Sequence, residues 1–110
     1  MTIAIEPSEK AQIISLQGQV NSSNAATVES EVLAVVQGGA KNVLLNMTEL
    51  SYISSAGLRV VLVLAKRLKQ AGGKLVIYGM QPHVREVFDI SGFLAILNVA
   101  ASRSEALEQF

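Results

Sequence analysis

Cysteine is absent from the 110-residue chain, and there is only one histidine, His83, and one aspartate, Asp89. Without cysteine the protein has no disulfide framework, no thiolate metal site and no cysteine nucleophile. A zinc site needs three or four histidine, cysteine or carboxylate ligands, and the chain is poor in them. A Ser-His-Asp triad would need both scarce residues, and no Gly-x-Ser-x-Gly motif is present. We therefore expect a protein that is not an enzyme, uses no cofactor and holds no metal.

Charge is also scarce, and its two signs balance. Charged residues make up 16% of the chain, against about 25% in a typical soluble protein. Nine lysines and arginines oppose nine aspartates and glutamates, so the formal net charge is zero. Because nucleic-acid binding needs a basic surface, we expect no nucleic acid among the partners. Half of the residues are apolar, which excludes an intrinsically disordered chain.

Long apolar segments are missing despite this composition. The longest uninterrupted apolar run, residues 60–65, has six residues, whereas a membrane-spanning helix needs about 20. The N-terminus lacks a basic segment followed by an apolar stretch, so no secretory signal is predicted. These absences predict a cytoplasmic protein that is not embedded in a membrane.

Short apolar runs that alternate with helical segments predict the fold. The predicted strands are residues 2–5, 12–18, 42–46, 74–78 and 96–99. Four helices are predicted. The first follows the polar residues 21–24, the second covers residues 56–71, the third begins at Pro82 and the fourth covers residues 102–110. Continuous apolar strands separated by helices are typical of a mainly parallel sheet, and the first two strands form an edge hairpin. We therefore predict a single α/β domain over residues 1–110, with about four helices and an N-terminal hairpin strand at the sheet edge.

The helix over residues 56–71 has the clearest apolar period. Its sheet-facing stripe is predicted at Leu58, Val61, Leu62, Ala65 and Leu68. Arg59 and Val60 lie near the helix start and off this stripe, so they are candidates for contact with a partner. Residues 51–55, just before the helix, are predicted to form a polar connection. The basic residues in and just after the helix predict a solvated face or a surface for an acidic partner: Arg59, Lys66, Arg67, Lys69 and Lys74.

The start of this helix, Ser54-Ser55-Ala56-Gly57, allows two interpretations. In the simpler one, Ser54 or Ser55 caps the helix by accepting a hydrogen bond from a backbone N–H, which is typically worth ~1 kcal/mol. In the other, Ser55 carries a phosphoryl group, which adds about −1.5 to −2 charge where a helix N-terminus stabilises an anion. Ala56 and Gly57 leave the serine uncrowded, and Arg59 is spaced to reach back to a phosphate.

Two segments of the chain follow a known sequence pattern. Residues 45–58 read Leu-Asn-Met-Thr-Glu-Leu-Ser-Tyr-Ile-Ser-Ser-Ala-Gly-Leu. They resemble the signature of STAS domains, in particular that of the bacterial anti-sigma factor antagonists, which is Leu-Asp-Leu-Ser followed after a few residues by Tyr-Ile-Asp-Ser-Ser-Gly-Leu. Residues 18–21, Gly-Gln-Val-Asn, resemble the family's Gly-x-hydrophobic-Asp turn after the second strand. The order of elements is also similar, so the resemblance covers nearly the whole chain and implies the STAS fold.

The resemblance implies a binding protein in a partner-switching circuit. The unphosphorylated protein would bind an anti-sigma factor serine kinase, which then releases its sigma factor. Phosphorylation at Ser55, with Ser54 as the second candidate, would break the complex, and a phosphatase would restore it. A homodimer is one alternative for its assembly. The predicted partner-binding residues are Asn21, Ser22, Tyr52, Ser54, Ser55, Ala56, Gly57, Arg59 and Val60.

The chain departs from the family pattern at several polar positions. Asn21, Asn46 and Ser54 replace its aspartates, and Ala56 replaces its second serine. The lost charge beside the acceptor serine favours an alternative function, a STAS scaffold or accessory subunit of a signalling or membrane transport complex without a phosphorylation cycle. A small enzyme or nucleotide binder has less support, because the chain has no phosphate-binding glycine loop.

Overall fold

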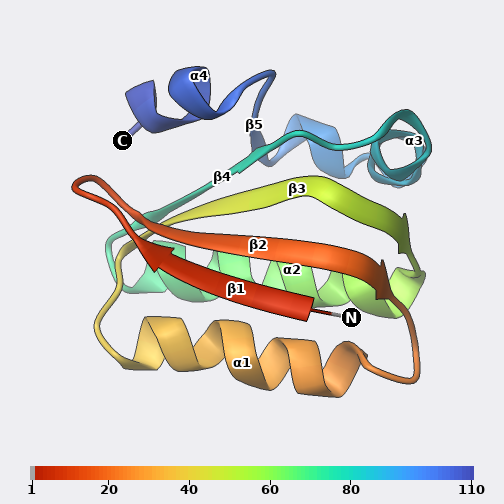
Figure 1. Ribbon diagram of the computed structural model, residues 1–110, viewed down its shortest axis with the longest axis horizontal. Helices are drawn as coiled ribbons and strands as arrows, with labels where there is room; N and C mark the ends of the chain where they lie inside the picture. The colour runs from red at the N-terminus through yellow and green to blue at the C-terminus, as the bar shows by residue number, and fades with distance from the viewer. Residues whose placement is uncertain (1) are drawn as a thin grey trace.

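The computed structural model describes residues 2–110 and contains one five-stranded sheet with helices on both faces (Figure 1). The elements, in chain order, are β1 (Thr2–Pro7), β2 (Gln12–Val20), α1 (Ala25–Gln37), β3 (Asn42–Ile53), α2 (Ser55–Gln70), β4 (Lys74–Tyr78), α3 (Pro82–Ile90), the 3-10 turn η1 (Phe93–Ala95), β5 (Asn98–Ala100) and α4 (Arg103–Glu108). The strands lie in the order β1-β2-β3-β4-β5. Only the β1–β2 pair is antiparallel among the described strands. The predicted α/β class, edge hairpin and mainly parallel sheet are confirmed.

The central strands are buried on both faces of the sheet. Leu44 and Leu45 are neighbours in β3, so their side chains point to opposite faces, yet both are buried. Helices α1 and α2 pack side by side against one face, and α4 covers part of the other (Figure 1). This two-sided burial explains why the strands appear in the sequence as continuous apolar runs.

Helix α2 buries a different stripe from the predicted one. Its buried side chains are Leu58, Val60, Val61, Leu64 and Leu68, whereas Leu62 and Ala65 are only half-buried. The reason is that α2 packs against α1 as well as against the sheet, so its buried arc turns towards α1. The prediction was therefore wrong for Leu62, whereas Ala65 is half-buried and packs against the core, and Val60 belongs to the core.

Strand β3 continues well beyond its predicted end at residue 46. Residues 51–53 were predicted to form a polar connection, but they pair with the end of β2, where Gln19 lies opposite Tyr52 and Val20 opposite Ile53. The β2–β3 register shifts twice along the way, which lets the polar middle of β3 bulge without ending the pairing.

A predicted capping residue caps α4 through its side chain, but the one at the start of α1 does not. Ser102 Oγ accepts a hydrogen bond from Glu105 N at 3.2 Å and caps α4, and Pro82 is the first residue of α3. Asn24 occupies the N-cap position of α1 but makes no side-chain cap, because its amide is used within the preceding loop. No helix between residues 2 and 110 combines the length and the apolar character needed to cross a membrane.

Candidate functional site

The start of α2 is joined directly to the carboxyl ends of β2 and β3. Ser54 N donates a hydrogen bond to Val20 O at 2.9 Å, immediately after the two strands end their pairing. The backbone of Ser54 is extended, with φ −91° and ψ 176°, and the helix begins at the next residue. The strands therefore fix where the first turn of α2 stands.

Ser54 and Ser55 have different roles at this point. Ser54 Oγ accepts a hydrogen bond from Gly57 N at 3.3 Å, so Ser54 is the N-cap. Ser55 is the first helical residue, and it is exposed to solvent. The capping interpretation therefore holds for Ser54 and leaves Ser55 at the surface.

Gly57 allows the helix start to lie close against the strands. A Cβ atom at this position would lie 2.6 Å from Ile53 Cγ1 and 2.9 Å from Val20 Cγ1. Both separations are shorter than the ~3.5–4.0 Å of an optimal carbon–carbon contact. The sequence-based interpretation gave Gly57 the role of leaving the serine uncrowded, whereas the structure places its open side against the core.

The loop between β2 and α1 lies beside Ser54 and is held by its own asparagines. Asn21 Oδ1 accepts hydrogen bonds from Ser23 N at 3.0 Å and from Ser23 Oγ at 2.6 Å. Asn24 Oδ1 accepts from Asn21 N at 2.9 Å, and Asn24 Nδ2 donates to Gln19 O at 2.8 Å. These bonds fix the loop and leave Ser22 exposed at its tip.

Asn46 organises the bulged part of β3 in the same way. Its Oδ1 accepts from Thr48 N at 3.0 Å and from Thr48 Oγ1 at 2.9 Å, while its Nδ2 donates to Ser15 Oγ at 3.1 Å. The sequence flagged Asn46 only as a departure from the family pattern, and this bonding was not predicted.

The start of α3 is tied to the extension of β3. Gln81 Nε2 donates to Thr48 O at 3.1 Å, and His83 Nε2 donates to the Ser51 carbonyl oxygen. His83 is exposed in the first turn of α3. Neither contact was predicted, because both join residues that are more than thirty positions apart.

The predicted partner-binding residues divide into an exposed, a half-buried and a buried group. Ser22, Ser55 and Arg59 are exposed, and Tyr52 is 47% exposed. Three others are half-buried beneath them: Asn21, Ser54 and Ala56. Gly57 and Val60 are buried, with Val60 only 6% exposed, so the assignment of these two to a contact surface is corrected.

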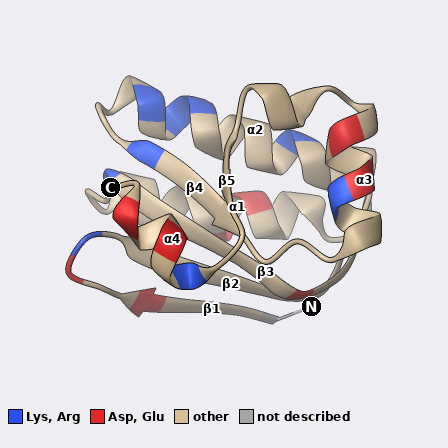
Figure 2. Ribbon diagram, turned by 90° about the horizontal axis from the view of Figure 1, so that it is seen from above, with Lys and Arg blue, Asp and Glu red and all other residues tan. Residues whose placement is uncertain are grey.

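Ser55 has no acidic neighbour in the first turn of its own helix. Arg59 lies one turn further along α2. The other basic residues of α2 lie towards its far end, and a further lysine, Lys74, begins β4 (Figure 2). A helix N-terminus carries partial positive charge, so this position accommodates an added anion. No group of three or more histidines, carboxylates or cysteines within residues 2–110 could hold a metal ion.

The fold and the site together define an α/β domain in which an exposed serine begins the helix after the third strand. The STAS domain family model matches residues 2–106, and the chain belongs to the STAS domain family. The chain is 50% identical over 110 residues to BtrV of Bordetella bronchiseptica, a protein assigned as an anti-sigma factor antagonist. That alignment covers 100% of this chain and 95% of BtrV.

Solved structures share the same fold. A Thermotoga maritima protein, TM1081, superposes with a TM-score of 0.92 at 19% identity, covering 97% of this chain and 92% of that one. The anti-sigma factor antagonist SpoIIAA in its unphosphorylated form gives a TM-score of 0.81 at 24% identity, over 98% of this chain and 95% of SpoIIAA. Phosphorylated SpoIIAA from Bacillus gives 0.74 at 22% identity, with 98% of each chain covered. The predicted STAS fold is confirmed.

Proposed function

We propose that this protein is an anti-sigma factor antagonist, which binds an anti-sigma factor serine kinase through the surface around Ser55 while that serine is unphosphorylated. The observation that carries the proposal is an exposed serine at the first position of α2, next to a separate serine that caps the helix. The general role of anti-sigma factor antagonist is assigned to BtrV, which matches the whole chain at 50% identity. The protein acts as a binder and a substrate, and the ATP belongs to its kinase.

Phosphorylation of Ser55 would act through charge rather than through unfolding. A phosphoryl group adds about −1.5 to −2 charge, and the acid-free first turn of α2 accommodates it. The same charge would lie in the contact surface that Tyr52 and Arg59 offer to the kinase. Burying it there without a matching partner group costs free energy, so the complex dissociates. A cytoplasmic phosphatase would restore the binding form.

The site is tested by incubating the protein with the kinase of its own organism and ATP, followed by mass spectrometry. We expect one phosphoryl group on Ser55 in the wild type and in Ser54→Ala, and none at that site in Ser55→Ala. Ser55→Asp should weaken kinase binding by at least about tenfold, because the charge is desolvated in the complex.

Ser104→Asp is a matched control, since Ser104 is also an exposed serine in the first turn of a helix that a serine caps. It should bind the kinase as the wild type does, and both aspartate variants should stay folded. Absence of phosphate from Ser55 and Ser54, together with unchanged kinase binding by Ser55→Asp, would refute the switch.

A second candidate function is favoured by one observation, the presence of Ser54 where the family pattern has an aspartate before the acceptor serine. In this alternative the protein is a STAS scaffold or an accessory subunit of a signalling or membrane transport complex. A pull-down from the source organism separates the two. Recovery of transporter or scaffold subunits without a histidine-kinase-like ATPase would favour the alternative.

A further inference from the structure

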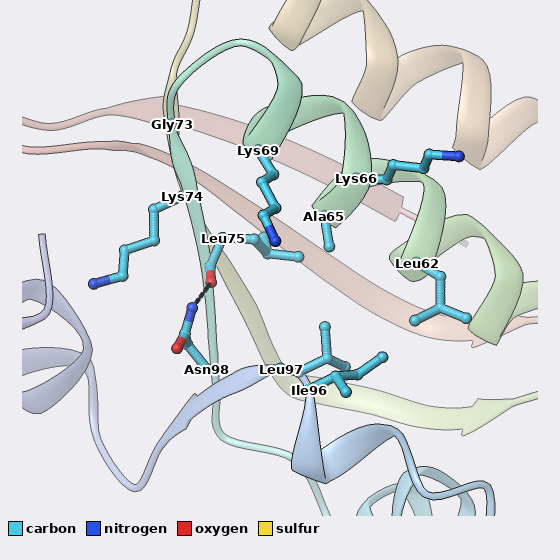
Figure 3. A pocket seen from close by; sticks show the side chains of 10 residues that line it. All are labelled: Leu62, Ala65, Lys66, Lys69, Gly73, Lys74, Leu75, Ile96, Leu97 and Asn98. Carbon is cyan, nitrogen blue, oxygen red and sulfur yellow. Dashed lines mark hydrogen bonds between the residues drawn. The ribbon is translucent and has the colours of Figure 1, made fainter.

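A pocket lies between α2, the start of β4 and the segment that leads into β5 (Figure 3). Its volume is about 450 Å³, within the range of about 300–1,000 Å³ that is common for small-molecule sites. We propose that this pocket binds an anionic amphiphile, a molecule with a straight hydrocarbon chain and one carboxylate. The apolar side chains that form its walls are Leu62, Ala65, Leu75, Ile96 and Leu97.

The walls of this pocket expose apolar surface that the fold itself does not cover. Ile96 is 71% exposed, and Leu62, Ala65 and Leu97 are only half-buried. In Figure 3 the side chains of Leu62, Ile96 and Leu97 point towards the same space. Because burying apolar surface is favourable, a hydrocarbon chain in this space would be stabilised by all of these side chains at once.

The rim of the pocket is cationic. Lys66, Lys69 and Lys74 line it, and no acidic residue does. Within residues 2–110, the structure contains an ion pair between Arg103 and Glu6. None of the three lysine ammonium groups at the rim is paired with a carboxylate there.

Lys69 is the lysine placed to meet a ligand, since the Lys66 side chain points away from the pocket in Figure 3. Lys74 Nζ donates to Gln109 O at 2.6 Å, whereas Lys66 and Lys69 are exposed. In Figure 3 the Lys69 side chain extends over the pocket towards Leu75. An anionic head group beside this ammonium group would be attracted, and a cationic one would be repelled.

The Leu75 carbonyl group at the pocket is already occupied. Asn98 Nδ2 donates to Leu75 O at 3.2 Å (Figure 3), and β5 pairs with β4 from Asn98 onwards. A peptide strand would therefore find no open edge of β4 at this place. The groups left for recognition are apolar side chains and ammonium groups, which fit a hydrocarbon chain with one anionic end.

The pocket is separate from the site of the proposed function, and the inference goes beyond that function. Lys69 follows Ser55 by fourteen positions in α2, which corresponds to roughly 21 Å along the helix axis. A variant of the pocket can therefore be tested without altering the serine or its surroundings.

The probe is dodecanoate, titrated below its micelle concentration and followed by amide chemical shifts. We expect saturable shifts confined to residues 62–75 and 96–98. Dodecyltrimethylammonium, which has the same chain and a cationic head group, should bind at least roughly fivefold more weakly.

Two exposed residues provide variants that leave the core intact, each with a matched control. Lys69→Glu should weaken dodecanoate binding roughly fivefold, whereas Arg67→Glu, in the same helical turn but outside the pocket, should not. Ile96→Ser should weaken it similarly, whereas Ile90→Ser, at an isoleucine that is 79% exposed elsewhere, should not.

Several results would overturn the proposal. They are shifts spread over the whole surface, equal binding of the cationic amphiphile, or wild-type binding by Ile96→Ser. Binding of an acidic amphipathic peptide without any binding of dodecanoate would assign the pocket to a protein partner and would also overturn it. The affinity of Ser55→Asp for dodecanoate should equal that of the wild type, which keeps this test independent of the phosphorylation switch.

Discussion

Replacement of Gly57 by alanine tests how tightly α2 is seated on the strands. The new methyl group would lie 2.6 Å from Ile53 Cγ1 and 2.9 Å from Val20 Cγ1. Both neighbours are buried, and both are branched at Cβ, so neither can rotate away freely within the packed core. The start of α2 would have to move away from the strands, or the core beneath it would have to repack.

Two opposing effects decide the sign of the change in stability. Alanine favours a helix over glycine by up to about 1 kcal/mol, and by less in the first turn. Adding a methyl group to a well-packed core costs typically about 1–3 kcal/mol. Because two contacts at Gly57 are too short at once, we expect the steric cost to dominate. The free energy of unfolding should fall by about 1–2 kcal/mol.

Urea unfolding followed by circular dichroism measures this change. Gly38→Ala is the control, because Gly38 has an ordinary φ of −75° and its new Cβ would meet no atom closer than Ala34 O at 3.3 Å. It should change stability by no more than about 0.5 kcal/mol. The double variant Gly57→Ala/Ile53→Ala should lose less unfolding free energy than the two single variants lose together, since the new methyl group then fills the space that Ile53 vacates. A gain in stability on Gly57→Ala alone would refute the close seating of α2.

Three other positions test the polar bonds and the surface charges. Ser54→Ala removes the cap of α2 and should lower the urea unfolding free energy by about 1 kcal/mol, whereas Ser54→Asp should retain it; equal stability of Ser54→Ala and wild type would contradict the cap. Asn46→Ala leaves Ser15 and Thr48 without their hydrogen-bond partner, so the free energy of unfolding, measured by thermal unfolding, should fall by about 1–2 kcal/mol. Asn46→Asp should lose less than half of that free energy, because its carboxylate still accepts the hydrogen bonds from Thr48. Glu6→Gln removes an exposed ion pair and should change stability by no more than about 0.5 kcal/mol, even at low salt.

The strands that could be predicted from the sequence are those with their own continuous apolar run. Lys74–Tyr78 matches its predicted bounds because its run is flanked by glycines. The second half of β3 has no such run, since residues 48–53 mix polar and apolar side chains. Pairing with β2 across a shifted register makes it a strand, and that pairing depends on residues about thirty positions away.

The same distinction applies to the candidate site. Ser54 and Ser55 could be located from local rules, because a serine pair before a periodic apolar segment indicates a helix start. The burial of Val60 could not be predicted, because α2 packs against α1 as well as against the sheet, and the period of a single helix does not show that second contact. The pocket was missed for a related reason, since the segment that leads into β5 brings Ile96 and Leu97 to the side of α2, far from them in the sequence.

The polar residues at the aspartate positions of the family pattern accept hydrogen bonds without carrying a charge. Asn21, Asn46 and Ser54 each use a side-chain oxygen to accept a hydrogen bond from a nearby backbone N–H. Such a bond needs an acceptor oxygen and not a negative charge, so the turns and the cap form without aspartate. A phosphoryl group on Ser55 would meet the positive end of α2 without a carboxylate at the adjacent residue to repel it. At these positions the chain therefore forms its turns and its helix cap without negative charge, and an added negative charge on Ser55 would meet less repulsion in the folded protein.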